Sequence, residues 1–153
     1  MNYNFFLKTA FILSKESKCV SKQVGAILVH DYRIISTGYN GTPSGHLNCN
    51  EIFNINKFDR EEHHQFSLQQ ELHSEQNCIA FAAKHGIPTE NCTLFCTLEP
   101  CDDCLKLIIA AGIKNIFYLF DYDYSDKNNP LRQYVHIERI NNDDINDFLL
   151  KIE

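Results

Sequence analysis

Apolar and polar positions repeat with two different periods along this chain, and each change of period marks a new element. Residues 3–17 place apolar side chains three to four positions apart, which predicts an amphipathic helix that faces a core. Two stretches rich in valine and isoleucine, residues 24–29 and 33–39, follow on either side of a short polar turn. They predict a β-hairpin.

The middle of the chain is more polar and less regular. Residues 39–45 contain glycine and proline, which predicts a loop. Residues 46–66 show no steady period and predict an irregular excursion. Residues 69–85 regain helical spacing, and Gly86 is expected to end that helix.

The second half alternates short apolar strands with helices. The pattern predicts strands at residues 93–97, 114–120 and 134–140, and helices at residues 101–111 and 143–152. Because a helix separates the first two of these strands, they are expected to be parallel neighbours. Strands that alternate with helices also imply a sheet covered on both faces, so the fold class is α/β.

Composition favours one folded domain, spanning residues 1–153, with 44% hydrophobic and 22% charged residues. The formal net charge of -6 argues against a broad nucleic-acid-binding surface but allows a small anionic substrate. The apolar run at residues 5–13 is interrupted by Lys8 and is too short to span a bilayer. We therefore expect a cytoplasmic protein with no membrane partner.

One set of residues carries the candidate chemistry. In a reducing compartment, the seven cysteines are expected to bind metal rather than form disulfides. His73, Glu75, Pro100, Cys101 and Cys104 form the pattern H-x-E…P-C-x-x-C. One imidazole and two thiolates can hold a zinc ion and leave a fourth position for water, as catalytic zinc sites do. The two cysteines are three positions apart at a helix start, where the helix dipole favours thiolates.

Glu75 is the candidate proton carrier of this site. Side chains two positions apart in a helix point roughly 200° apart, so His73 is expected to lie at the helix cap. Zinc lowers the pKa of its water toward neutrality, and Glu75 would carry a proton from it to a base and to leaving ammonia. The alternatives are a structural zinc knuckle, which would prefer four protein ligands, and cysteines that only pack.

The pattern H-x-E…P-C-x-x-C is the recorded signature of the zinc nucleobase deaminases, and most of the chain resembles one branch of them. Matching stretches include residues 16–19, 24–26, 34–41, 48–49, 71–77 and 111–114. The Gly-Tyr-Asn-Gly loop at residues 38–41 resembles that of the deoxycytidylate (dCMP) deaminases, most closely those of phages. The resemblance implies a cytidine-deaminase-like three-layer α/β/α sandwich with a mixed five-stranded sheet. It also implies zinc-dependent hydrolysis of dCMP to dUMP and ammonia, which supplies dUMP for thymidylate synthesis.

The resemblance further implies partners and regulation. It implies a homo-oligomer, commonly a hexamer, that dCTP activates and dTTP inhibits, with Mg²⁺ accompanying the effector and no nucleic-acid partner. By match, Asn40 would contact the nucleotide sugar and Tyr122 would lie near the substrate. The loop with Tyr39, Gly41 and Gly45 would lie near the effector site. If the source is viral, the compartment is the host cytoplasm.

A second, structural zinc is implied by the same resemblance. Its ligands would be the residues that match those of the phage relatives: Cys19, Cys49, His63 and Glu71. Such a site would tie the first helix, the irregular excursion and the helix of His73 together. The alternative is four unrelated polar residues.

The chain departs from the dCMP deaminases at a few positions. Glu99, before Pro100, resembles the tRNA-adenosine and riboflavin-pathway deaminases instead. Residues 125–135 are too short for the helix that the resembling deaminases place between the last two strands, so a brief turn must connect them. The alternative functions are a dCTP or 5-substituted dCMP deaminase, a tRNA or free-base deaminase, and a regulatory nucleotide-binding protein without turnover.

Overall fold

The elements of the computed structural model follow the predicted order, with differences in the polar middle. The structure describes residues 1–152. The helices are α1 (Tyr3–Ser14), α2 (Cys49–Ile52), α3 (Arg60–Gln70), α4 (Ser74–Lys84), α5 (Asp102–Ala110) and α6 (Asp143–Ile152). The strands are β1 (Gly25–His30), β2 (Arg33–Tyr39), β3 (Thr93–Leu98), β4 (Asn115–Phe120) and β5 (His136–Arg139), and a 3-10 turn, η1 (Pro130–Tyr134), precedes the last.

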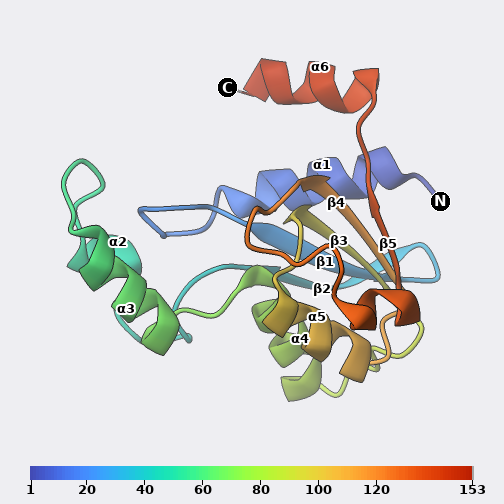
Figure 1. Ribbon diagram of the computed structural model, residues 1–153, viewed down its shortest axis with the longest axis horizontal. Helices are drawn as coiled ribbons and strands as arrows, with labels where there is room; N and C mark the ends of the chain where they lie inside the picture. Colours follow the sequence, from blue (N-terminus) through green and yellow to red (C-terminus); the bar gives the residue numbers. More distant parts are fainter. Residues whose placement is uncertain (153) are drawn as a thin grey trace.

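The strands form a mixed five-stranded sheet in the order β2-β1-β3-β4-β5. Strand β1 is antiparallel to both of its neighbours, and β3, β4 and β5 run parallel. Helix α1 covers one face with α6 outside it, while α4 and α5 cover the other face (Figure 1). The predicted hairpin, parallel pair and three-layer α/β/α arrangement are confirmed. Helices α2 and α3 project to one side of the sheet (Figure 1).

The core lies on both faces of the central strands because successive side chains of a strand point to opposite sides. Ala26 and Leu28 face the cluster beneath α4 and α5, whereas Ile27 and Val29 face the cluster beneath α1. All four are almost fully buried. A strand buried on both faces is a continuous apolar run, which is what the sequence shows here. Within residues 1–152, no helix combines the length and apolar composition needed to cross a membrane.

Two glycines let the helices approach the sheet closely. A methyl group at Gly38 in β2 would lie 2.4 Å from the carbonyl oxygen of Ser74 and 2.5 Å from the backbone nitrogen of Cys78. A methyl group at Gly25 in β1 would lie 2.2 Å from the carbonyl oxygen of Ala10 in α1. Both obstacles are helix backbone, which cannot move aside as a flexible side chain would. The position of α4, which begins directly after His73, therefore depends on Gly38.

We expect Gly38→Ala to lower the free energy of unfolding by about 3 kcal/mol, because α4 must move away from β2. Chemical denaturation of the two proteins measures this loss. Gly41→Ala is the matched control, since a methyl group there meets no atom of residues 1–152 within 4 Å. It should change stability by less than about 0.5 kcal/mol. Equal stability of the Gly38 variant and the parent chain would contradict the tight helix–sheet contact.

The prediction of an irregular excursion over residues 46–66 is wrong in part. It contains α2, and α3 begins at Arg60 after Asp59, whose side chain accepts a hydrogen bond from the Glu62 backbone. Helix α3 is polar, and its buried side chains, His63 and Phe66, pack on a few aromatic residues rather than on the main core. So small a buried face leaves no helical period in the sequence.

Some predicted boundaries are also wrong. The helix predicted over residues 69–85 begins only at Ser74, because residues 71–73 are extended and Leu72 pairs with Gly41 across an isolated bridge. The first helix ends at Ser14 rather than at residue 17. Strand β5 begins at His136, two residues later than predicted, because η1 occupies residues 130–134. The brief turn predicted for that connection is confirmed.

Candidate metal centres and active site

Two helix N-termini meet beside the C-terminal end of β3 and bring three donor atoms together. His73 is the N-cap of α4, and Cys101 is the N-cap of α5 with Cys104 in its first turn. The His73 Nδ1 atom lies 3.2 Å from Cys104 Sγ and 3.5 Å from Cys101 Sγ. We call His73, Cys101 and Cys104 the first donor cluster. The prediction that His73 lies at a helix cap is confirmed.

The spacing of the first donor cluster fits one tetrahedral zinc ion. Donors at about 2.3 Å (sulfur) and 2.0 Å (nitrogen) from such an ion lie about 3.5 Å from each other. The two measured sulfur–nitrogen distances agree with this value. Within residues 1–152 only three side chains belong to the cluster, so a fourth position remains for a water molecule or substrate.

Glu75 lies beside the first donor cluster, in the first turn of α4. Its side chain is buried, and its Oε1 atom accepts a hydrogen bond of 2.9 Å from Ser74 Oγ. Burial raises the pKa of the Glu75 carboxyl above its ordinary value, despite the hydrogen bonds from Cys104 and Ser74. A carboxylate in this environment gains or loses a proton more readily near neutral pH than an exposed one.

The thiols of the first donor cluster have very different proton affinities. A hydrogen bond from Cys104, and a further one from His73, lower the pKa of Cys101 to about 4 despite burial. The pKa of Cys104 is raised, because it shares its proton with Cys101 and is buried. The hydrogen bond to Cys101 also raises the pKa of His73. Of the two thiols, Cys101 therefore loses its proton more readily than Cys104.

Four other donors lie together where the loop that follows α1 meets α2 and α3. We call Cys19, Cys49, His63 and Glu71 the second donor cluster. His63 Nε2 lies 3.6 Å from Cys19 Sγ and 3.3 Å from Cys49 Sγ, and Cys19 Sγ lies 3.6 Å from Glu71 Oε2. Glu71 Oε1 is buried and has no hydrogen-bond partner within residues 1–152.

The second donor cluster also fits a tetrahedral zinc ion. Its donor distances match the edge of about 3.5 Å expected for such an ion. It offers four protein donors, the number usual for a structural site. Burial raises the pKa of Cys49 to about 12 and also raises the pKa of Cys19, so a nearby cation would be needed to keep both as thiolates at neutral pH.

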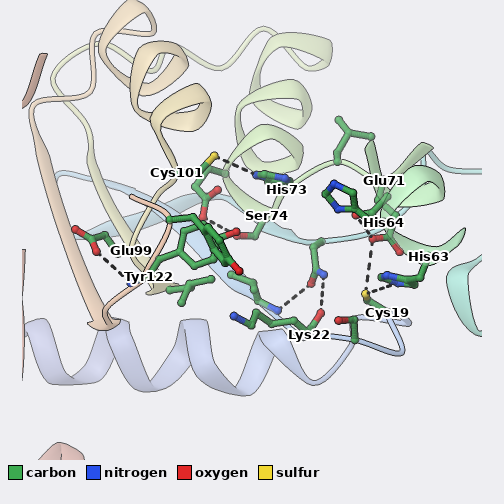
Figure 2. Close-up of a pocket in the computed structure, with 18 of the residues that line it drawn as sticks. Cys19, Lys22, His63, His64, Glu71, His73, Ser74, Glu99, Cys101 and Tyr122 are labelled. Carbon is green, nitrogen blue, oxygen red and sulfur yellow. Dashed lines mark hydrogen bonds between the residues drawn. The ribbon is translucent and has the colours of Figure 1, made fainter. Parts of the chain in front are cut away.

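A pocket of about 450 Å³ lies between the two donor clusters. Figure 2 shows His73 and Cys101 on one side of it and Cys19, His63 and Glu71 on the other. Its lining also includes Ser21, Lys22, Asn40, Arg60, His64, Glu75, Glu99, Tyr122 and Tyr124. The pocket therefore combines a metal-binding corner, basic side chains and aromatic rings.

The residues predicted near substrate and effector divide into two groups. Among the described residues, the pocket lining includes Asn40 and Tyr122 but not Tyr39, Gly41 or Gly45. The side-chain amide of Asn40 bonds to the backbone of Val24 and Lys22 at 2.8 and 2.7 Å, so it shapes the pocket wall. A contact between Asn40 and a sugar, and an effector role for the other three, stay predictions.

Three residues that line the pocket were not predicted to belong to the site. Ser67 Oγ donates a 3.0 Å hydrogen bond to Glu71 Oε2, and its position four residues before Glu71 in α3 was the available signal. Arg60 lines the pocket but lies in a stretch predicted to be irregular. Glu99 was noted only as a departure from the family, although its carboxylate is fully buried against the pocket.

The mixed sheet, the paired helix N-termini and the adjacent buried glutamate together define the class of cytidine-deaminase-like zinc proteins. Comparison with known families agrees. The chain belongs to the cytidine and deoxycytidylate deaminase family, because residues 1–120 match its zinc-binding region.

Several members of this family are similar to the chain over most of its length. The deoxycytidylate deaminase of Enterobacteria phage T2 is 36% identical over 161 residues, which covers 85% of this chain and 84% of that protein. The corresponding enzyme of Enterobacteria phage T4 is also 36% identical and covers 85% and 82%. The crystal structure of dCMP deaminase from the cyanophage S-TIM5, in complex with dCMP and dUMP, superposes with a TM-score of 0.74. It is 36% identical and covers 89% of this chain and 94% of that chain.

Proposed function

We propose that this chain hydrolyses dCMP to dUMP and ammonia, and so supplies dUMP for thymidylate synthesis. The observation that carries the proposal is the first donor cluster with the buried Glu75 beside it, opening into a nucleotide-sized pocket. The dCMP- and dUMP-bound relative and the phage deoxycytidylate deaminases support this choice of substrate.

In this proposal His73, Cys101 and Cys104 hold a zinc ion. When bound, zinc supplies Lewis-acid activation of the attacking water near neutral pH. Glu75 accepts a proton from that water as its oxygen bonds to C4 of the cytosine ring. Glu75 gives this proton to the ring nitrogen N3. It then takes the second proton of the water, from the hydroxyl now on C4, and gives it to the amino group; as C4 forms its carbonyl, the C4–N4 bond breaks and ammonia leaves. One water is consumed and one ammonia leaves, so atoms and charge balance.

The basic side chains of the pocket favour a nucleotide over a free base. Lys22 and Arg60 line it together with His64, and Lys22 Nζ lies 5.2 Å from the ring centroid of Tyr122 (Figure 2). A few such donors suffice for one phosphate group, whereas RNA normally requires an extended basic surface. The net charge of -6 does not favour RNA.

We also propose that Cys19, Cys49, His63 and Glu71 hold a second, structural zinc ion. Support comes from the donor distances, the burial of both thiols and the unpartnered Oε1 atom of Glu71. Such an ion would join three segments that share little core: the loop after α1, α2 and α3. Their apolar cluster contains few side chains, so metal binding would supply much of their stability.

Regulation and assembly belong to the same proposal. The resemblance supports a homo-oligomer, commonly a hexamer, activated by dCTP and inhibited by dTTP with Mg²⁺ as the counterion. The effector would bind near the loop of Tyr39, Gly41 and Gly45. Sedimentation analysis with and without dCTP, dTTP and Mg²⁺ tests this part.

An ammonia-release assay over dCMP, dCTP, 5-methyl-dCMP, deoxycytidine, adenosine and tRNA tests the substrate. We expect the highest kcat/KM for dCMP and a value at least about tenfold lower for deoxycytidine, because loss of the phosphate removes its charge-assisted hydrogen bonds with Lys22 and Arg60, the exposed basic side chains of the pocket. Deamination of tRNA alone would overturn the proposal. Nucleotide binding without ammonia release would instead identify a regulatory nucleotide-binding protein.

A further inference from the structure

Glu99 is a fully buried carboxylate that no step of the proposed reaction uses. It follows β3 and lies two positions before Cys101, at the edge of the pocket. Its side chain has 0% exposed surface. A buried charge is costly unless it is paired and hydrogen-bonded, so its partners reveal what it holds in place.

All side-chain partners of Glu99 come from the connection between β4 and β5. Its Oε1 atom accepts a 3.1 Å hydrogen bond from the Tyr122 backbone and forms an ion pair with Lys127. Its Oε2 atom accepts a 3.0 Å hydrogen bond from Arg132 Nη2. The Glu99 carboxylate therefore contacts three residues, Tyr122, Lys127 and Arg132, within a stretch of eleven residues. Such charge-assisted hydrogen bonds are the strongest kind available to a side chain.

The first part of this connection has little apolar core, whereas Leu131 and Val135 near its end pack on the cluster beneath α4 and α5. Of residues 121–129, all of them described, only Ser125 is buried. Ser125 Oγ donates to the Pro100 carbonyl oxygen at 2.7 Å, and Asn129 Nδ2 donates to Asp102 Oδ1 at 3.0 Å. Residues 121–129 are thus held by polar contacts with residues 99–102, in which Glu99 and Asp102 bond to two residues each. Arg132 is a third partner of Glu99.

The position of the connection decides where the ring of Tyr122 lies. Tyr122 lines the pocket, packs on Tyr124 with ring centroids 5.4 Å apart, and faces the ammonium group of Lys22. Figure 2 shows Tyr122 between Glu99 and Lys22, with its backbone bonded to Glu99. A shift of this backbone would move one wall of the pocket, whereas the first donor cluster is held by the N-termini of α4 and α5.

We propose that Glu99 is a positioning residue for nucleotide binding, because its buried carboxylate fixes the β4–β5 connection and thereby holds Tyr122 as a wall of the pocket. This inference rests on the proposed function for its kinetic consequence, but not for its structural one. It also gives a role to the residue at which this chain departs from the dCMP deaminases it resembles.

The kinetic experiment compares Glu99→Gln with the parent chain on dCMP. We expect KM to rise about tenfold and kcat to change less than about threefold, because the pocket wall moves while Glu75 and the metal donors stay in place. The matched control is Glu138→Gln, which removes a carboxylate from a half-exposed pair with His136 outside the pocket lining. It should leave both constants unchanged. A fall in kcat with constant KM would overturn the proposal.

Arg132 provides an independent variant if Glu99→Gln does not fold. Arg132→Gln removes one of the two cations of Glu99 and should also raise KM, whereas Arg132→Lys retains a charge and should restore most of the affinity. A purely structural role would lower the melting temperature without this split between KM and kcat. Equal KM values for Arg132→Gln, Arg132→Lys and the parent would count against the inference.

A fluorescence experiment tests the positioning without any substrate. The chain contains no tryptophan, so Tyr122→Trp creates a single reporter at the pocket wall. Adding Glu99→Gln should shift the emission to longer wavelength and increase quenching by acrylamide, while adding Glu138→Gln should do neither. An unchanged emission would refute the positioning role even if dCMP proved to be the substrate. A shifted emission with no activity on any cytosine nucleotide would refute only the proposed function.

Discussion

Replacement of Glu75 by glutamine is expected to lower kcat for dCMP about a thousandfold. Glutamine has the same size and can still accept the hydrogen bond from Ser74 Oγ, so the local packing should survive. The amide cannot take a proton from water or return one to the ring. Metal content and dCMP affinity should therefore remain close to those of the parent chain.

Steady-state kinetics, metal analysis and calorimetric titration with dCMP together measure the Glu75→Gln effect. Asp143→Asn is a suitable control, since it makes the same carboxylate-to-amide change in the first turn of α6, on the opposite side of the sheet. It should leave kcat unchanged. If Glu75→Gln kept more than about a tenth of the parent activity, Glu75 would not be the proton carrier.

Replacement of Cys49 by alanine is expected to reduce the zinc content from two ions per chain to one. Cys49 is buried and its Sγ atom lies 3.3 Å from His63 Nε2, so its loss leaves only three donors around the second centre. At free zinc a thousandfold above Kd, binding stabilises a folded chain by about 4 kcal/mol. We expect a loss of at least about that size, because α2 and α3 have little other core.

Mass spectrometry of metals and thermal unfolding at fixed free zinc measure both effects. Cys92→Ala is the matched control, because Cys92 is equally buried but lies in the main core outside both donor clusters. The Cys92→Ala variant should keep both zinc ions and lose only the stability that comes from packing one small side chain. One zinc per parent chain, unchanged by Cys49→Ala, would remove the second centre from the proposal.

The fold was accessible from the sequence where elements bury a regular face. Strands β1, β3 and β4 are continuous apolar runs because the sheet is covered on both sides, and the parallel β3–β4 pair follows from the helix between them. Helix α3 escaped prediction because it buries only His63 and Phe66. Its stability comes from tertiary contacts and capping, which leave no period of 3.6 residues in the sequence.

The two donor clusters of the candidate site also differ in how far the sequence pattern alone predicted them. The order and spacing of His73, Glu75, Cys101 and Cys104 were sufficient to predict that three donor side chains and a carboxylate lie together, because donor type and helix-start position are local properties of the chain. The second donor cluster was predicted only through resemblance. Its members come from three separate segments, and spacing alone does not distinguish them from unrelated polar residues.

The sequence by itself therefore determined the sheet, most of its helices and the grouping of the first donor cluster, since each depends on patterns among neighbouring residues in the chain. Folding in three dimensions was needed to reveal the pocket between the two donor clusters, the close contact of Gly38 with α4, and the gathering of Tyr122, Lys127 and Arg132 by Glu99. These features join residues that are distant along the chain. The physical reason is that burial and pairing of charge depend on neighbours in space, and a linear pattern does not contain them.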